Sequence, residues 1–255
     1  MRTVRPSIVC IAKTEINEDA ISGFLRNEGL VWNRSNGVTP GDDLIEFSGR
    51  ICYMSFGERQ SPRDNGEYIL NLIDSGHESV LEHMSWTFVA SGVSRAFTHQ
   101  LVRHRVGFSY SQLSQQYYDE SEACFVAPPS LKKGSSVYKK WGEAMTDSLA
   151  RYREILASAK TLDISDSFEK KERSREIRST ARSVLPNAIE TKIVFSANAR
   201  ALRGFLVARG AIKGDWEMRE VSVQLFKILQ KDAPSIFQDF EQVALEDGSL
   251  AVVKK

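Results

Sequence analysis

The segment 84-MSWTFVASGVSRAFTHQLVRHRVGFSYSQLSQQYY-118 joins three different sequence patterns in direct succession. Residues 84–93 are rich in aromatic and β-branched side chains, which predicts a β-strand. The following 94-SRAFTHQLVRHR-105 predicts a helix with Ser94 as its N-cap, because a serine oxygen can accept hydrogen bonds from the free N–H groups of a first turn. The chain from 106 to 128, which ends at Pro128-Pro129, is expected to be extended and irregular.

Strands and helices follow one another irregularly on both sides of this segment. Further strands are predicted at 6–14 and 190–198, and residues 27–43 are expected to form a loop. Helices are predicted at 43–53, 65–76, 137–160, 165–183 and 199–210, from Asp215 onward, and near 233–241, with 161-TLDIS-165 as a connection. Because regular βαβ alternation is missing, the sequence predicts an α+β fold in one domain that covers residues 1–255.

The composition is that of an ordinary globular protein, with 42% hydrophobic and 26% charged residues and a formal net charge of +1. Such a balance provides no overall basic field, so neither nucleic acid nor a membrane is expected as a partner. The N-terminus lacks the apolar run of a signal peptide, which favours a cytoplasmic protein. Cys10, Cys52 and Cys124 are far apart and are expected to be reduced thiols.

The triplet Arg103-His104-Arg105 admits two interpretations. It can be a polar helix end, where cations offset the carbonyl dipoles. However, successive helical residues lie about 100° apart, so three adjacent cationic side chains point in different directions. Such an arrangement can contact several groups of one anionic ligand. Arginine suits phosphate because its planar guanidinium forms bidentate hydrogen bonds.

The polar run 109-SYSQLSQQY-117 follows the triplet and carries hydroxyls and amides that both donate and accept hydrogen bonds. These groups suit the edge of a pyrimidine, although a polar loop of this composition is also common. All four histidines lie between His77 and His104, but His77 and His83 are six apart, and His99 and His104 are five apart. Neither spacing is the i, i+4 spacing of a helical zinc motif, and no metal is predicted.

A second set of arginines lies downstream. Arg200 and Arg209 are nine residues apart on a predicted helix, which directs them to opposite faces. Between them, Arg203 is expected to be an ordinary surface residue. Leu202, Phe205 and Leu206 are expected to form the buried face of the same helix.

Taken in order along the chain, these blocks resemble the flavin-dependent thymidylate synthases. The similarity covers nearly the whole sequence and includes 46-EFSGRICYMS-55, 76-GHESVLEH-83, the triplet with its polar run, and 181-ARSVLPNAIETKIVFSANARAL-202. The resemblance implies an α+β fold and a homotetramer whose active sites form where subunits meet. It also implies FAD, NADPH and methylenetetrahydrofolate as cofactors in the methylation of dUMP or of a related pyrimidine nucleotide.

The resemblance also assigns residues to roles. It implies Arg209 and Ser114 as catalytic residues, with Arg209 favouring ionisation at N3 of the uracil. The residues that it implies for FAD are Ser79, Arg103, His104, Arg105, Gln112, Asn198 and Arg200, with His77 and Glu82 lining the flavin pocket. Those that it implies for the nucleotide are Gln100, Arg103, Gln112, Leu113, Ser114, Gln115, Gln116, Arg182 and Arg209.

The sequence departs from the family pattern at four points. Eight residues, where seven are usual, separate Arg-His-Arg from Ser114, and Gly107 is expected to absorb the extra residue as a bulge. Gln116 replaces a phosphate-binding arginine, a loss of about 1.5–3 kcal/mol that Lys213 can partly offset by turning inward. Lys213 itself replaces a histidine, and Gly204 replaces a polar residue that often touches flavin.

These departures leave two alternatives to dUMP methylation. The chain can be a paralogue that uses the same flavin chemistry on a different pyrimidine nucleotide, or a protein that binds flavin or nucleotide without catalysis. The intact Arg103, Ser114, Arg182 and Arg209 argue against the second alternative. The settings of the cysteines also favour flavin chemistry, because none suits the thiolate nucleophile that the other class of thymidylate synthase requires.

Overall fold

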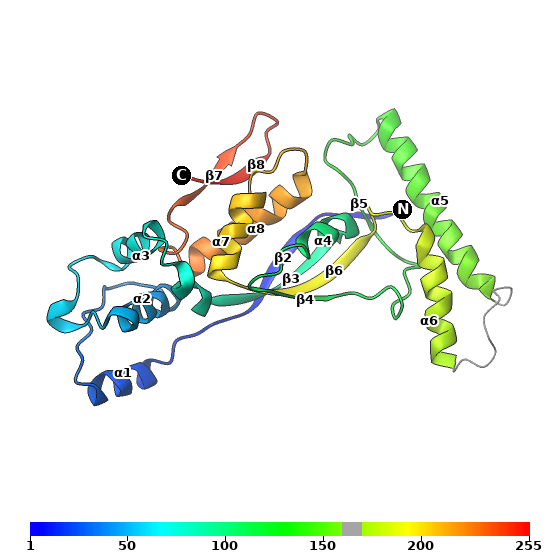
Figure 1. The fold of residues 1–255 in the computed structure, drawn as a ribbon. Coiled ribbons are helices and arrows are strands. Elements are labelled where there is room, and N and C mark those ends of the chain that lie inside the picture. The colour runs from blue at the N-terminus through cyan, green and yellow to red at the C-terminus, as the bar shows by residue number, and fades with distance from the viewer. Residues whose placement is uncertain (160–169) are drawn as a thin grey trace. The chain divides into compact units, whose positions relative to one another are not determined.

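The computed structural model describes residues 1–159 and 170–255 and confirms the predicted α+β fold (Figure 1). The chain separates into two compact units, each made of several stretches of sequence. Unit 1 comprises Met1–Ser7, Ala90–Arg103 and Tyr110–Val194, and unit 2 comprises Ile8–Val89, His104–Ser109 and Phe195–Lys255. The expectation of one domain remains a prediction. The predicted connection 161–165 lies outside the described residues.

A four-stranded sheet has the order β2-β3-β6-β4. Its strands are β2 (Ser7–Lys13), β3 (Ser85–Ser94), β4 (Phe108–Gln112) and β6 (Glu190–Asn198). In β3 the side chains of Trp86, Phe88 and Ala90 are buried, with partly exposed residues between them, as the period of two of a strand requires. The predicted strands at 6–14, 84–93 and 190–198 are therefore confirmed within a residue or two at each end.

Unit 1 contains a small hydrophobic core of its own. Phe125, Met145, Leu149 and Ile189 are buried together. The remaining elements are β1 (Thr3–Val4) paired in parallel with β5 (Phe125–Val126), and the helices α4 (Arg95–Leu101), α5 (Ser136–Ala157), α6 (Lys170–Ala181) and the short 3-10 turn η4 (Arg182–Val184). Helices α5 and α6 pack against each other (Figure 1).

Unit 2 holds the larger core, in which Ile45, Phe88, Phe205 and Phe237 are almost completely buried. Its helical elements are α1 (Glu18–Asn27), α2 (Pro40–Tyr53), η1 (Gly57–Arg59), α3 (Asn65–Asp74), η2 (Glu78–His83), α7 (Ala199–Arg209) and α8 (Trp216–Asp232). The strands β7 (Phe240–Ala244) and β8 (Leu250–Lys254) form an antiparallel hairpin that packs on α8.

Two predicted helix starts are confirmed by their caps. The Ser94 side chain accepts a hydrogen bond from the N–H of Phe97, and the Asp215 side chain accepts one from Met218. The helix after Ser94 ends at Leu101, however, so the predicted continuation to Arg105 is wrong. The triplet begins in the turns that follow, where the N–H of Arg103 donates to the carbonyl of Gln100.

Three other predictions are corrected. The helix expected near 233–241 is wrong. These residues are described, and they form turns at 234–239 before β7 begins at Phe240. The expected loop at 27–43 already becomes helix at Pro40, capped by Thr39. Arg203 is buried rather than on the surface, because its guanidinium pairs with Asp239 at 2.6 and 2.7 Å.

Candidate functional site

The residues assigned from the sequence fall into two groups, one in each unit. Unit 2 carries His77, Ser79, Glu82, His104, Arg105, Asn198, Arg200 and Arg209. Unit 1 carries Gln100, Arg103, Gln112, Leu113, Ser114, Gln115, Gln116 and Arg182.

In unit 2, a cavity of about 490 Å³ opens beside the first turn of α7; we call it the Asn198 cavity. Its size is typical of small-molecule sites, which span about 300–1,000 Å³. The residues that line it are Glu82, His104, Arg105, Val106, Phe108, Asn198, Arg200, Ala201, Gly204 and Phe205. Five assigned residues therefore share one cavity, whereas the exposed His77 and Ser79 do not line it.

Asn198 connects the strand β6 to the helix α7 at the wall of the cavity. Its backbone is extended, at φ −83° and ψ 166°, and its side chain accepts a hydrogen bond from the N–H of Ala201. Its own N–H donates to the carbonyl of Gly107 at 3.2 Å. Asn198 thus fixes both the start of α7 and the position of the turn that follows the triplet.

Gly107 makes that turn possible. The N–H of Phe108 bonds to the carbonyl of Arg105, and Gly107 has a φ of +73° at the third position of the turn, where such a backbone favours glycine. An added Cβ would lie 2.7 Å from the Cβ of Ala201 and 2.8 Å from the Asn198 amide nitrogen. The unusual backbone predicted for Gly107 is confirmed, in a tight turn rather than in a bulge.

His104, which lines this cavity, is paired with Arg209. The Arg209 Nε donates to the His104 Nε2 at 3.1 Å. The imidazole also packs edge-on against Phe205, with ring centroids 5.0 Å apart, and against Phe108. Burial and, secondarily, the charge of Arg209 lower the pKa of His104, which favours the neutral ring with its proton on Nδ1.

Arg200 is held at the mouth of the cavity by acidic residues of η2. Its guanidinium bonds to Glu82 at 2.7 Å and approaches Glu78 at 3.6 Å. The hydrogen bond to Glu82 raises the pKa of Arg200, whose side chain is well exposed. Exposed pairs of this kind contribute little stability and open at little cost, so Arg200 is preoriented and still able to bind a ligand. Glu78 was not among the site residues predicted from the sequence.

Tyr53 was also not identified from the sequence. Its hydroxyl lies 2.8 Å from the Nδ1 of His77, and the two rings are 5.8 Å apart and tilted. Both side chains are exposed. The sequence did contain a signal for Tyr53, because this residue belongs to the block 46-EFSGRICYMS-55. Its hydrogen bond positions His77, one of the assigned residues.

In unit 1, Gln112 is held in place by two buried threonines. Its amide nitrogen donates to Thr98 at 2.9 Å and to Thr191 at 3.4 Å. The Thr98 hydroxyl donates in turn to the carbonyl of Arg95, so the Thr98 oxygen must accept from Gln112. The amide nitrogen of Gln112 is therefore committed, and the group that Gln112 can offer a ligand is its carbonyl oxygen.

Ser114 begins a tight turn that continues to Tyr118. The Ser114 carbonyl accepts from the N–H groups of Tyr117 and Tyr118, and its hydroxyl accepts from that of Gln116 at 3.3 Å. The Gln116 side chain donates to the Ser179 hydroxyl of α6 at 2.9 Å. Arg178 donates to the backbone carbonyl of Gln116 at 3.4 Å. We call Arg95, Arg178 and Arg182, with the turn from Ser114 to Tyr118, the arginine cluster.

Two arginines of this cluster, Arg95 and Arg182, influence each other. Burial lowers the pKa of Arg95, Glu120 opposes that effect, and the charge of Arg182 lowers the pKa further. The Glu120 carboxyl is itself buried, which raises its pKa. Within residues 1–159 and 170–255 neither Arg178 nor Arg182 forms an ion pair. Arg103, the assigned residue at the end of α4, is exposed.

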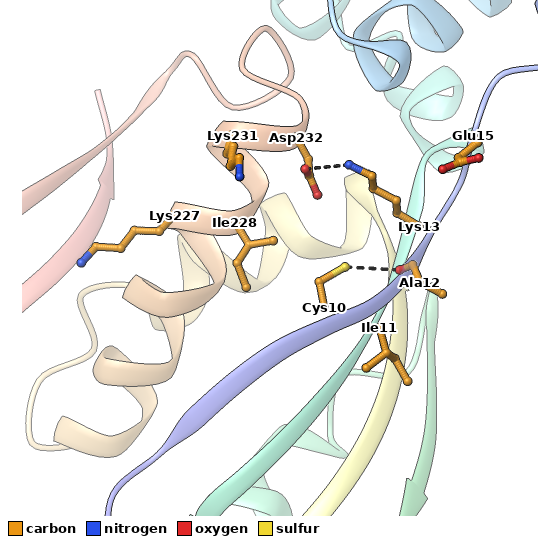
Figure 2. Close-up of a pocket in the computed structure, with 9 residues that line it drawn as sticks. All are labelled: Cys10, Ile11, Ala12, Lys13, Glu15, Lys227, Ile228, Lys231 and Asp232. Atoms are coloured by element: carbon orange, nitrogen blue, oxygen red, sulfur yellow. Dashed lines mark hydrogen bonds and ion pairs between the residues drawn. The ribbon is translucent and has the colours of Figure 1, made fainter.

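A larger cavity in unit 2, about 630 Å³, contains none of the assigned residues. Figure 2 shows that two of the charged residues that line it, Lys13 and Asp232, form an ion pair with each other. The two charged atoms are 2.8 Å apart. Asp232 also accepts from the Trp86 indole. The Cys10 thiol donates to the carbonyl of Ala12, and burial raises its pKa, so it remains a thiol rather than a nucleophilic thiolate.

The described residues contain no helix long and apolar enough to cross a membrane. They also contain no group of three or more His, Cys, Asp or Glu side chains placed to hold a metal ion.

Comparison with known proteins gives one consistent result. Residues 37–235 match the family model described as thymidylate synthase complementing protein. The flavin-dependent thymidylate synthase of Mycolicibacterium vanbaalenii is 41% identical over 241 residues, which cover 94% of this chain and 91% of the relative. That of Mycobacterium avium is 39% identical over 241 residues and 94% of each chain. That of Mycobacterium tuberculosis is 40% identical over 243 residues, covering 94% and 91%.

Proposed function

The chain belongs to the flavin-dependent thymidylate synthases, enzymes of dUMP methylation, and from this premise we propose how its residues divide the work. FAD binds at the Asn198 cavity, the phosphate of dUMP binds at the arginine cluster, and Arg209 acts on the uracil. The observation that carries this proposal is the hydrogen bond from Arg209 to His104, which lines the cavity.

The Asn198 cavity fits a flavin in three respects. It combines the aromatic side chains of Phe108 and Phe205 with the cation of Arg105, as a molecule with a flat ring and phosphates requires. The first turn of α7 borders it, and helix N-termini favour phosphate. A Cβ added at Gly204 would meet nothing within 4 Å, so no side chain fills this part of the wall. When bound, the reduced flavin supplies the hydride that completes the methyl group.

Arg209 keeps a full positive charge for the substrate. Among the described residues its guanidinium bonds only to a neutral imidazole and to no carboxylate. A hydrogen bond from Nε fixes the plane of the guanidinium and leaves its two terminal nitrogens for a ligand. We infer that these nitrogens stabilise negative charge that develops on the uracil at N3, a role for which preorganised donors are worth several kcal/mol.

The residues of unit 1 recognise the nucleotide. Gln112 offers an oxygen acceptor from a position that Thr98 and Thr191 fix, and Ser114 offers a hydroxyl, here in the predicted catalytic role. Arg182 supplies a cation for the phosphate. Gln100, Leu113 and Gln115 complete the proposed contacts. Cys10 remains protonated, consistent with a reaction that needs no thiolate attack.

NADPH as the reductant and methylenetetrahydrofolate as the methylene donor belong to the same proposal. So do a single functional domain, a cytoplasmic location and a homotetramer whose subunits share active sites. Light scattering that finds a fully active monomer would disprove the tetramer.

A turnover assay tests the function. Purified protein with FAD, NADPH, methylenetetrahydrofolate and dUMP should form dTMP. A specific observation keeps a second candidate open: Gln116, in place of a phosphate-binding arginine, bonds to Ser179. If dTMP does not form but another pyrimidine nucleotide reoxidises the flavin, the paralogue function replaces the first. If flavin binds and no nucleotide reacts, the chain is a binding protein.

A further inference from the structure

Gln116 has a structural task in this chain. Its amide nitrogen donates to Ser179 of α6 at 2.9 Å, so the side chain lies against the helix and joins it to the Ser114 turn. An amide carries no charge, and this one has already used a donor within the protein. If the nucleotide phosphate is bound here, its charge must be met by another residue.

Arg178 lies next to Ser179 and directs its guanidinium to the same place. One terminal nitrogen donates to the backbone carbonyl of Gln116 at 3.4 Å. The side chain is partly buried, and within the described ranges no carboxylate forms an ion pair with it. A guanidinium has about five N–H donors, so most of those of Arg178 remain available. Asp119 forms its hydrogen bonds with Ser121 and Tyr152, and Arg178 acts on it only through its charge, which is the smallest of the effects that lower the pKa of Asp119 against the effect of burial.

Arg182 follows four residues later, the spacing that brings helical neighbours together, although it lies in the turn η4 just after the helix. The pKa of the half-buried Arg95 is lowered mainly by burial, while Glu120 opposes this effect. The charge of Arg182 lowers the pKa of Arg95 further. Like charges that approach each other in a partly desolvated place are unfavourable unless an anion joins them. The cluster therefore fits a phosphate monoester with two negative charges.

We propose that Arg178 binds the 5′-phosphate of the nucleotide and supplies there the positive charge that Gln116 lacks. This inference rests on the proposed function and adds a specificity-determining residue to it. The bond to the Gln116 carbonyl aims the guanidinium, and the bond from Gln116 to Ser179 holds α6 so that Arg178 reaches the site.

The test uses the full-length holoenzyme and measures dUMP affinity from the change in the flavin spectrum. Arg178→Gln should weaken dUMP binding about ten- to a hundred-fold, because one charged hydrogen-bonding partner is lost. Adding Gln116→Arg to Arg178→Gln should restore most of the affinity by returning a cation to the site. Arg151→Gln removes the same charge from an exposed position on α5 and should leave the affinity unchanged.

The double variant separates a ligand-binding role from a structural one. If Arg178 only anchors α6, the double variant should be worse than Arg178→Gln, because the bond from Gln116 to Ser179 is lost as well. That result, or wild-type affinity in Arg178→Gln, would overturn this inference alone. No response of the wild-type protein to dUMP would overturn both this inference and the proposed function.

Discussion

Arg209 and His104 lie 105 positions apart in the sequence, and their side chains meet in a single hydrogen bond of 3.1 Å. The direction of the bond makes the imidazole an acceptor, and burial together with the arginine charge keeps it neutral by lowering its pKa. A cation is thereby held in place without being neutralised. This distinguishes Arg209 from Arg200, whose charge is offset by Glu78 and Glu82.

Replacement of Arg209 should affect chemistry more than cofactor binding. Arg209→Ala removes the donor proposed to face the uracil, and nucleotide-dependent oxidation of reduced flavin should slow by about 10²–10³-fold. The FAD content of the purified protein should change little, because Arg209 does not line the Asn198 cavity. Rapid-mixing absorbance measurements report the rate. Val207→Ala, at an exposed position of the same helix, is the control. Equal losses of FAD and rate would show that Arg209 acts through the flavin site instead.

His104 predicts a pH dependence of stability. Its pKa is lower in the folded protein than in the unfolded chain, where histidine has a pKa of about 6.5. Below that pH the unfolded state binds the proton more readily, so the free energy of unfolding should fall as the pH drops from about 6.5 toward the folded-state pKa. His104→Gln keeps an acceptor for Arg209 but does not titrate. Denaturant unfolding between pH 5 and 8 should therefore show a smaller loss for the variant, and parallel curves would refute the prediction.

Gly107→Ala should impair flavin binding with little effect elsewhere. The added Cβ would meet Ala201 and Asn198 at distances that force the turn away from α7, and the left-handed backbone strains any side chain. We expect a clear drop in bound FAD per subunit, measured by absorbance after gel filtration. Gly29→Ala is the matched control, since Gly29 has a similar left-handed backbone at φ +63°, its Cβ would meet no atom within 4 Å, and it does not line the Asn198 cavity. An unchanged flavin content in Gly107→Ala would contradict the proposed position of the flavin.

The sequence was most informative where local chemistry decides the structure. Ser94 and Asp215 cap helices because a side-chain oxygen three residues before an N–H needs no distant partner. Gly107 could be recognised as a left-handed position for the same local reason. The assigned residues around Asn198 also share a cavity, although their roles in binding remain predictions.

Long-range partners were not predictable from the sequence. The burial of Arg203 depends on Asp239, 36 positions away, and the task of Gln116 depends on Ser179, 63 positions away. The C-terminal hairpin did carry a local signal in the sequence, because Asp247-Gly248 is a turn dipeptide between two apolar runs. In the structure Gly248 has the positive φ, +76°, that such a turn requires. The apolar residues at 233–241 suggested a helix instead, since short apolar runs fit both structures.

A single-turnover experiment tests the central claim most directly. The flavin of the purified protein is reduced with NADPH without oxygen, and dUMP and methylenetetrahydrofolate are then added. The proposed function predicts that one dTMP forms for each flavin that is reoxidised. Reoxidation without dTMP, or no reoxidation in the presence of dUMP, would contradict it.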